Sequence, residues 1–265
     1  MTFQSHIDGS RHMLSPERSI EIQAELLGAD ISMQLDECTE FPSSFERAKQ
    51  SMELSLRWGQ RSLAAFGNRP DQTLFAIVQG STYPELRRQS AEASVAETIS
   101  GGFGGFAIGG LAVGEGHEKM CETLEFTTPF LPKSRPRYLM GVGKPIDLVE
   151  AVARGVDMFD CVIPTRSGRH GQVWTDHGPY NIKNARFAED ETALDDTIDC
   201  PASQNYSKAY VHHLIRSGEL LGSMVLSWHN LAYFQDLMKR IRAAIQAGTF
   251  DDFRANFRAN YGASN

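Results

Sequence analysis

The sequence lacks any apolar run that is long enough to cross a membrane. A spanning helix needs about 20 mostly apolar residues, and the N-terminus also lacks the basic and apolar regions of a secretory signal. Cysteine is scarce, and Cys38, Cys121, Cys161 and Cys200 follow no disulfide-framework spacing. Scattered cysteines are typical of proteins from a reducing compartment. We therefore predict a cytoplasmic protein that has no membrane partner.

An excess of basic residues is also absent, because the formal net charge is -7. A negative net charge argues mildly against nucleic acid as a partner. It is a weak guide, however, since a local cluster of Lys and Arg is enough to hold phosphates. With 265 residues, of which 41% are hydrophobic and 22% charged, the chain is long enough for one large core or two small ones.

Segments with strand character alternate with helical patterns along the chain. Strands are expected at residues 31–35, 74–78, 106–108, 138–140, 158–161 and 224–227, each followed by a helical segment. This alternation predicts an α/β fold with a parallel sheet. A doubly wound sheet would want a Gly-rich phosphate loop after its first strand, and Asp36-Glu37-Cys38 is not one.

A TIM-type (β/α)8 barrel fits the alternation better, although it needs eight units. The sequence offers about six, so we predict a single barrel domain over residues 1–265 that lacks the first strands.

The stretch 157–171 places a carboxylate, Asp160, at the end of an apolar run, and a loop with proline and arginine follows at once. A lone buried carboxylate is costly to desolvate, whereas active sites of parallel α/β folds lie at the carboxyl ends of their strands. Asp is also common in turns. This stretch alone therefore leaves a capping role and a chemical role equally open.

The residues at the other expected strand ends favour the chemical role. They are Asp36, Gln79, Gly109-Gly110 and Met140-Gly141. A carboxylate can accept two parallel N–H bonds, an amide can donate or accept, and glycine leaves its N–H accessible. This set matches the edge of guanine, with N1–H and the 2-amino group on the acid and O6 on the donors. Asp160 would then face the sugar carbon as a nucleophile.

Six separated motifs carry a family resemblance. They are His-Ile-Asp-Gly-Ser-Arg-His (6–12), Leu-Asp-Glu-Cys-Thr (35–39), Val-Gln-Gly-Ser (78–81), Gly-Gly-Leu-Ala-Val-Gly-Glu (109–115), Tyr-Leu-Met-Gly-Val-Gly-Lys-Pro (138–145) and Phe-Asp-Cys-Val-Ile-Pro-Thr-Arg (159–166). In this order they strongly resemble bacterial tRNA-guanine transglycosylases, over essentially the whole chain. The resemblance implies a TIM-type barrel that exchanges guanine for the 7-deazaguanine preQ1 at the anticodon wobble position of tRNA, a step of queuosine biosynthesis.

The resemblance also implies roles for individual residues. Asp160 matches the nucleophile that forms the covalent link to ribose. The positions that match base-binding residues are Asp36, Gln79, Gly109, Gly110, Leu111 and Met140. The positions that match RNA-binding residues are Gly141, Val142, Gly143, Lys144, Pro145, Asp147, Thr165, Arg166, Ser167, Gly168 and Arg169. The basic members of this set suit phosphates, and the target base must leave its stack to reach the pocket. Cys38 and Val113 resemble the bacterial pocket, which favours preQ1 over queuine.

The sequence departs from the family at its N-terminus. Members carry a further segment with early barrel strands and an aspartate that acts as general base. Without that segment we expect impaired exchange, and exposed sheet edges that favour association, with a homodimer as one assembly. The alternative is a non-catalytic truncated paralogue that binds tRNA or a full-length partner subunit. A glycosidase with Asp36 and Asp160 is less favoured, because Gln79 and the paired glycines suit a base better than a sugar.

Zinc is the second departure. The family binds zinc through a Cys-x-Cys-x-x-Cys run and a distant histidine, and the matching positions here read Ile198, Cys200, Ser203 and His229. Only Cys200 and His229 keep good ligand side chains, whereas a structural zinc normally has four ligands. We therefore expect residues 185–229 to form a degenerate zinc-binding subdomain without metal, and we expect no organic cofactor.

Overall fold

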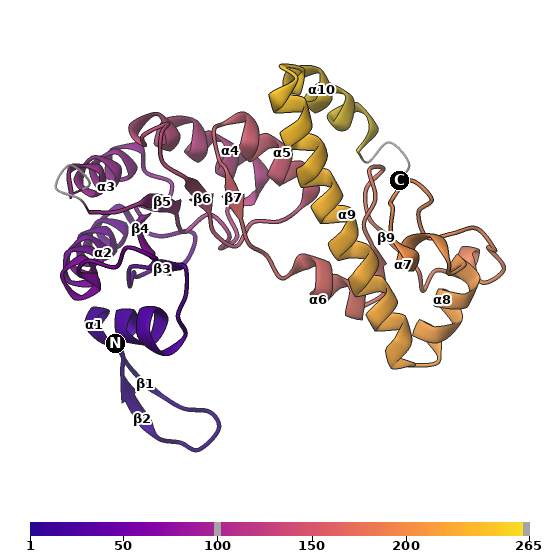
Figure 1. Cartoon of the computed structure of the whole chain (residues 1–265), viewed down its shortest axis with the longest axis horizontal. Coiled ribbons are helices and arrows are strands. Elements are labelled where there is room, and N and C mark those ends of the chain that lie inside the picture. The colour runs from indigo at the N-terminus through magenta and orange to yellow at the C-terminus, as the bar shows by residue number, and fades with distance from the viewer. Residues whose placement is uncertain (98–101, 262–265) are drawn as a thin grey trace. The chain divides into compact units, whose positions relative to one another are not determined.

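The computed structural model describes residues 1–97 and 102–261 (Figure 1). Its contacts group into two compact units: Met1–Val142 with Arg154–Asp160, and Gly143–Ala153 with Cys161–Asn265. The parallel sheet belongs to the first unit, and the longest helix belongs to the second. The single domain over residues 1–265 and the subdomain at 185–229 stay predictions.

The first unit contains a curled, parallel, five-stranded sheet that resembles half of a barrel (Figure 1). Its strands are β3 (Ile31–Met33), β4 (Thr73–Val78), β5 (Gly105–Ile108), β6 (Arg137–Leu139) and β7 (Met158–Phe159). Each strand pairs in parallel with the next one along the chain. Sequential order with parallel pairing is the arrangement of a TIM-type fold, so the α/β class is confirmed.

Strands β4 and β5 are buried, since β5 is covered along its whole length and β4 from its second residue on. Phe75, Ile77, Phe106 and Ile108 are each at most 2% exposed. Such continuous apolar runs are expected where a parallel sheet is covered on both faces. Gly105 leaves room for the ring of Phe75, because a Cβ there would overlap it. This core fixes where the strands end.

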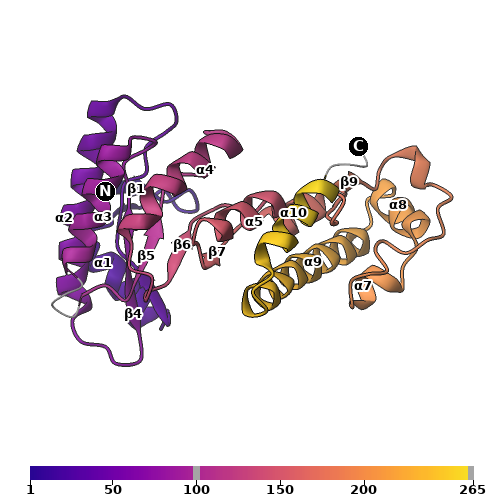
Figure 2. The same cartoon turned by 90° about the horizontal axis from the view of Figure 1, so that it is seen from above.

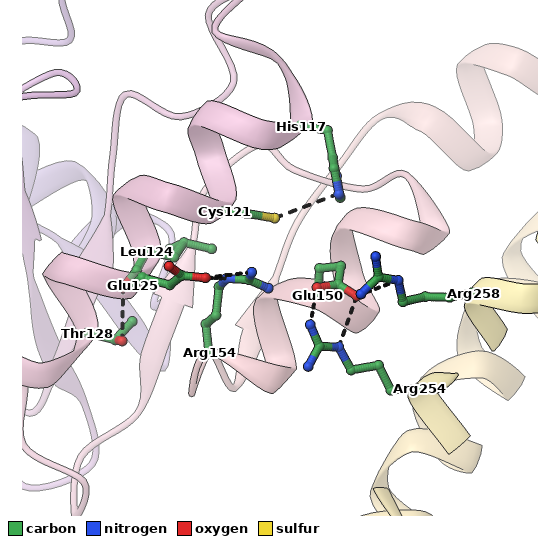
Figure 3. Close-up of polar contacts among 9 residues, drawn as sticks. All are labelled: His117, Cys121, Leu124, Glu125, Thr128, Glu150, Arg154, Arg254 and Arg258. Atoms are coloured by element: carbon green, nitrogen blue, oxygen red, sulfur yellow. Dashed lines mark hydrogen bonds and ion pairs between the residues drawn. The ribbon is translucent and has the colours of Figure 1, made fainter. Parts of the chain in front are cut away.

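Helices of the first unit follow the strands as the alternation predicts. They are α1 (Pro16–Ile20) with the π-helical η1 (Glu21–Leu26), α2 (Phe45–Phe66), α3 (Pro84–Ala96) and α4 (Gly116–Thr127) with the 3-10 turn η3 (Thr128–Phe130). Both α2 and α3 pack against β4 (Figure 2). An antiparallel hairpin of β1 (Thr2–Gln4) and β2 (Arg11–Met13) precedes them. Arg154 also binds Glu125 of α4 at 2.7 Å (Figure 3).

The second unit is built on one 27-residue helix, α9 (Leu220–Gln246). The other helices are α5 (Pro145–Ala153), α6 (Ile163–Arg169), α7 (Pro201–Gln204), α8 (Lys208–Arg216) and α10 (Phe250–Asn260), together with the 3-10 turn η4 (Ala185–Phe187). An antiparallel hairpin is formed by β8 (Gln172–Val173) and β9 (Tyr180–Asn181). Glu150 of α5 is bound by Arg254 and Arg258 of α10 (Figure 3).

The strand expected at 224–227 is wrong, because these residues lie inside α9. Within the described residues, the parallel sheet therefore has five strands rather than the predicted six or so. A run of four mostly apolar residues fits a strand and a buried helix equally well. Within the helix, Val225 and Leu226 face the core whereas Met224 is 59% exposed.

None of the helices that the structure describes combines the length and the apolar character that a membrane crossing requires.

Candidate active site

The carboxyl ends of the five strands form one edge of the sheet, because all five run in parallel. β3 ends three residues before Asp36, β4 just before Gln79, β5 just before Gly109 and β7 just before Asp160. The sequence predicts these residues as the site, and the fold places them all at that edge of the first unit.

Asp36 and Gln79 are in direct contact. The Gln79 amide Nε2 donates a hydrogen bond of 2.6 Å to Asp36 Oδ2. Burial raises the pKa of the Asp36 carboxyl, and the bond from Gln79 opposes that rise. Gln79 itself is 3% exposed, and its backbone N–H donates to Ser90 Oγ of α3 at 3.1 Å. The carboxylate is therefore partly desolvated and held by an amide that α3 keeps in place.

The two glycines at the end of β5 border the same amide. A Cβ on Gly110 would lie 2.9 Å from Gln79 Oε1, and one on Gly109 would lie 2.5 Å from Gln79 Nε2. The φ of Gly110 is +70°, a conformation that favours glycine. Three neighbouring strand ends thus bring a carboxylate, an amide and an accessible backbone together, as predicted.

Arg87 of α3 is a supporting residue that the sequence did not reveal. Its Nη1 donates to Val78 O at 2.9 Å and its Nε donates to Ser81 O at 2.6 Å, so the guanidinium spans the loop that carries Gln79. Burial lowers the pKa of Arg87 to about 10, which keeps it charged at neutral pH. From the sequence alone, an arginine in the first turn of a helix would be expected at the surface. It is buried here because the carbonyls of Val78 and Ser81 turn inward and accept its hydrogen bonds.

Asp160 is held at one oxygen only. Its Oδ1 accepts the Tyr138 hydroxyl at 2.6 Å and the Gly141 N–H at 2.8 Å. Among the described residues, no group is hydrogen-bonded to Oδ2, and the residue is exposed. Burial, followed by the bond to Asp160, raises the pKa of Tyr138, so the phenol stays a donor. Tyr138 lies in one of the six motifs, but it is not among the residues that the sequence predicts for the site.

The other predicted base contacts differ in exposure. Leu111 is 1% exposed and belongs to the core of the first unit. Met140 is half-buried, and its N–H continues the sheet by donating to Ile108 O at 3.3 Å.

The predicted RNA contacts of the second unit fall into two groups. Lys144, Arg166 and Arg169 are exposed. Ser167 is used internally, since it accepts the Trp174 indole N–H at 2.8 Å, and a Cβ on Gly168 would lie 2.9 Å from the Ser227 backbone N in α9. Thr165 and Asp147 are half-buried, and Pro145 is buried. Within the second unit, the three basic residues are therefore the exposed members of this set.

A TIM-type α/β enzyme with polar groups gathered at its strand ends is the class that this fold and site define. A family model described as queuine tRNA-ribosyltransferase matches residues 1–263. The queuine tRNA-ribosyltransferase of Caulobacter vibrioides is 63% identical over 261 residues, covering 98% of this chain and 69% of that relative. That of Zymomonas mobilis is 57% identical over 269 residues, covering 100% and 68%. That of Rickettsia africae is 56% identical over 253 residues, covering 96% and 69%.

The chain belongs to the queuine tRNA-ribosyltransferase family, which is a family of transferases. The resemblance inferred from the six motifs is thereby confirmed.

Proposed function

We propose that the chain exchanges guanine for preQ1 at the wobble position of tRNA anticodons, as a tRNA-guanine transglycosylase of queuosine biosynthesis. The observation that carries this proposal is the contact between Asp36 and Gln79 beside Gly110, at three adjacent strand ends. Family membership supports the class of reaction, and this cluster supports guanine as the base that is bound.

Guanine recognition follows from the donors and acceptors of the cluster. Asp36 accepts N1–H and the 2-amino group of the base side by side, while the Gln79 amide and the Gly110 N–H donate to O6. In the free protein Gln79 Nε2 occupies Asp36, so the amide turns from the carboxylate to the base when guanine enters. Adenine has neither N1–H nor the 2-amino group, so it could not replace the hydrogen bond that the Gln79 amide gives to the partly buried carboxylate. That mismatch makes the selection strong.

Base exchange then uses Asp160 as the nucleophile. Its Oδ2 attacks C1′ of the target ribose, the bond from C1′ to the guanine nitrogen breaks, and guanine leaves with the electron pair and takes up a proton. The incoming base attacks C1′, the bond from C1′ to Asp160 Oδ2 breaks and its electron pair returns to the carboxylate, and the base gives up a proton. Tyr138 and Gly141 hold Oδ1, so they keep the carboxylate aimed. This mechanism uses no organic cofactor.

The choice of preQ1 over queuine rests on the wall of the base pocket. Cys38 Sγ lies 3.9 Å from the point that a Cβ on Gly110 would occupy, so the sulfur borders the same cluster. A base with a larger substituent at that side would meet the sulfur. Lys144, Arg166 and Arg169 are exposed cations, and we assign them to tRNA phosphates.

Binding of labelled guanine to the full chain, with unlabelled guanine or adenine as competitor, tests this proposal. We expect guanine to compete at least about 100-fold better than adenine. Asp36→Asn should remove most of that preference, whereas Asp30→Asn, a change at an exposed aspartate of the same unit, should leave it intact. Equal competition by the two bases would contradict the proposed recognition.

A further inference from the structure

One buried histidine of the second unit has both ring nitrogens engaged. His229 is 0% exposed in α9. Its Nε2 lies 3.0 Å from Trp174 O, and its Nδ1 lies 2.9 Å from Ser203 Oγ. A carbonyl oxygen only accepts, so Nε2 carries the proton and donates it. Nδ1 is then an acceptor, and the Ser203 hydroxyl donates to it.

This arrangement bears directly on the zinc that the family resemblance implies. A structural zinc would need the lone pair of a histidine nitrogen and three further ligands. The Nδ1 lone pair is already bound by the Ser203 proton, Ile198 has no lone pair, and a neutral hydroxyl is a poor zinc ligand. Cys200 is 3% exposed and is a second ligand at most. In residues 1–97 and 102–261, no group of three or more His, Cys, Asp or Glu is arranged to hold a metal ion. The residues present do not fit zinc.

Other contacts hold the same segment in place without a charged ligand. Ile198 and Cys200 are 4% and 3% exposed, so both side chains are buried. The Asp195 N–H donates to Ser203 O at 3.2 Å, and the Tyr180 hydroxyl donates to Leu194 O at 3.0 Å. Each of the four positions where the family would place a zinc ligand is thus buried, and Ser203 and His229 are hydrogen-bonded to each other.

We propose that the Ser203 hydroxyl replaces the metal as the group that binds His229 Nδ1, so that α7 is joined to α9 without zinc. Two hydrogen bonds in series link α7, α9 and the hairpin that follows α6. The first runs from the Ser203 O–H to His229 Nδ1, and the second from His229 Nε2–H to the Trp174 carbonyl. This unit therefore folds independently of metal. The inference does not depend on the proposed activity.

The test uses the full chain, purified from medium with added zinc. Elemental analysis is expected to find less than about 0.1 zinc per chain, and a chelator should shift the melting temperature by less than about 1 °C. One zinc per chain that survives dialysis, or a clear drop in melting temperature with chelator, would overturn the proposal.

Two sets of variants sharpen the test. Ser203→Ala should lower the melting temperature by about 2 to 8 °C, because it leaves Nδ1 buried and unpaired. Ser217→Ala, at an exposed serine that follows α8, should shift it by less than about 1 °C. An unchanged melting temperature in Ser203→Ala would overturn the proposed bond.

The double variant Ile198→Cys/Ser203→Cys recreates the Cys-x-Cys-x-x-Cys run next to His229. We expect it to gain about one zinc per chain and to become sensitive to the chelator. A folded double variant that binds no zinc would contradict the proposal that the losses at Ile198 and Ser203 are what removes the metal. If the double variant does not fold, the zinc content of the unaltered chain and the Ser203→Ala shift decide the question.

Discussion

Replacing Gly110 by alanine tests the packing of the proposed base pocket. The added Cβ would lie 2.9 Å from Gln79 Oε1, so the amide has to move. That amide also makes the 2.6 Å bond to Asp36. Gly28 provides a matched control, because its φ of +65° is close to the +70° of Gly110 and nothing lies within 4 Å of its Cβ position. Both glycines belong to the first unit.

The two substitutions share one cost and differ in another. A non-glycine residue in the left-handed region costs about 1–2 kcal/mol, and this applies to Gly28→Ala and Gly110→Ala alike. Gly110→Ala also disrupts a hydrogen bond to a charged group, which contributes about 1.5–3 kcal/mol. We therefore expect losses of about 1–2 kcal/mol for Gly28→Ala and about 2.5–5 kcal/mol for Gly110→Ala.

Urea unfolding followed by circular dichroism measures both losses. A third comparison isolates the contact: in a Gln79→Ala background, Gly110→Ala should cost only the shared strain of about 1–2 kcal/mol. If Gly110→Ala and Gly28→Ala lose the same free energy of unfolding in the original chain, the contact between Gly110 and Gln79 has no energetic role and the reasoning is refuted.

Two further predictions concern charged groups. Burial raises the pKa of the Asp36 carboxyl, so the folded protein keeps the carboxyl proton to a higher pH than the unfolded chain does. The stability that this group contributes is therefore lost as the pH rises from about 4 through the folded pKa. Asp36→Asn should thus be more stable than the original chain at neutral pH and lose that advantage near pH 4, as urea unfolding at several pH values would show. Arg254→Met should cost about 2–4 kcal/mol, because Glu150 is only 4% exposed. Arg154→Met should cost less than about 1 kcal/mol, because its partner Glu125 is 61% exposed; equal losses in thermal unfolding would contradict this ranking.

The strand-end cluster could be predicted from sequence because parallel strands bring their carboxyl ends to one edge. Asp36, Gln79 and Gly110 lie far apart in the chain, but each directly follows or nearly follows a strand. The segment 224–227 resembles a strand in sequence, since four mostly apolar residues are too few to show whether their period is that of a strand or of a helix. Its place in α9 is set by packing beyond the segment itself.

Two features of the structure have no signal in the sequence. The burial of Arg87 depends on carbonyls that turn inward where Ser81 adopts a φ of 51°, and no local pattern predicts that turn. The loss of two ligand positions at Ile198 and Ser203 is visible in the sequence, but the hydrogen bond that Ser203 makes to His229 is not. The predicted impairment of exchange, the predicted homodimer and the predicted cytoplasmic location stay predictions.

Incorporation of labelled guanine into tRNA tests the central claim most directly. The protein should be in excess over tRNA, so that a slow reaction also registers. We expect the full chain to incorporate label and Asp160→Asn to fall to background, a loss of at least about 10⁴-fold, while tRNA binding by the variant stays unchanged. Incorporation by Asp160→Asn at the rate of the original chain, or tRNA binding by the original chain without any incorporation, would contradict the account.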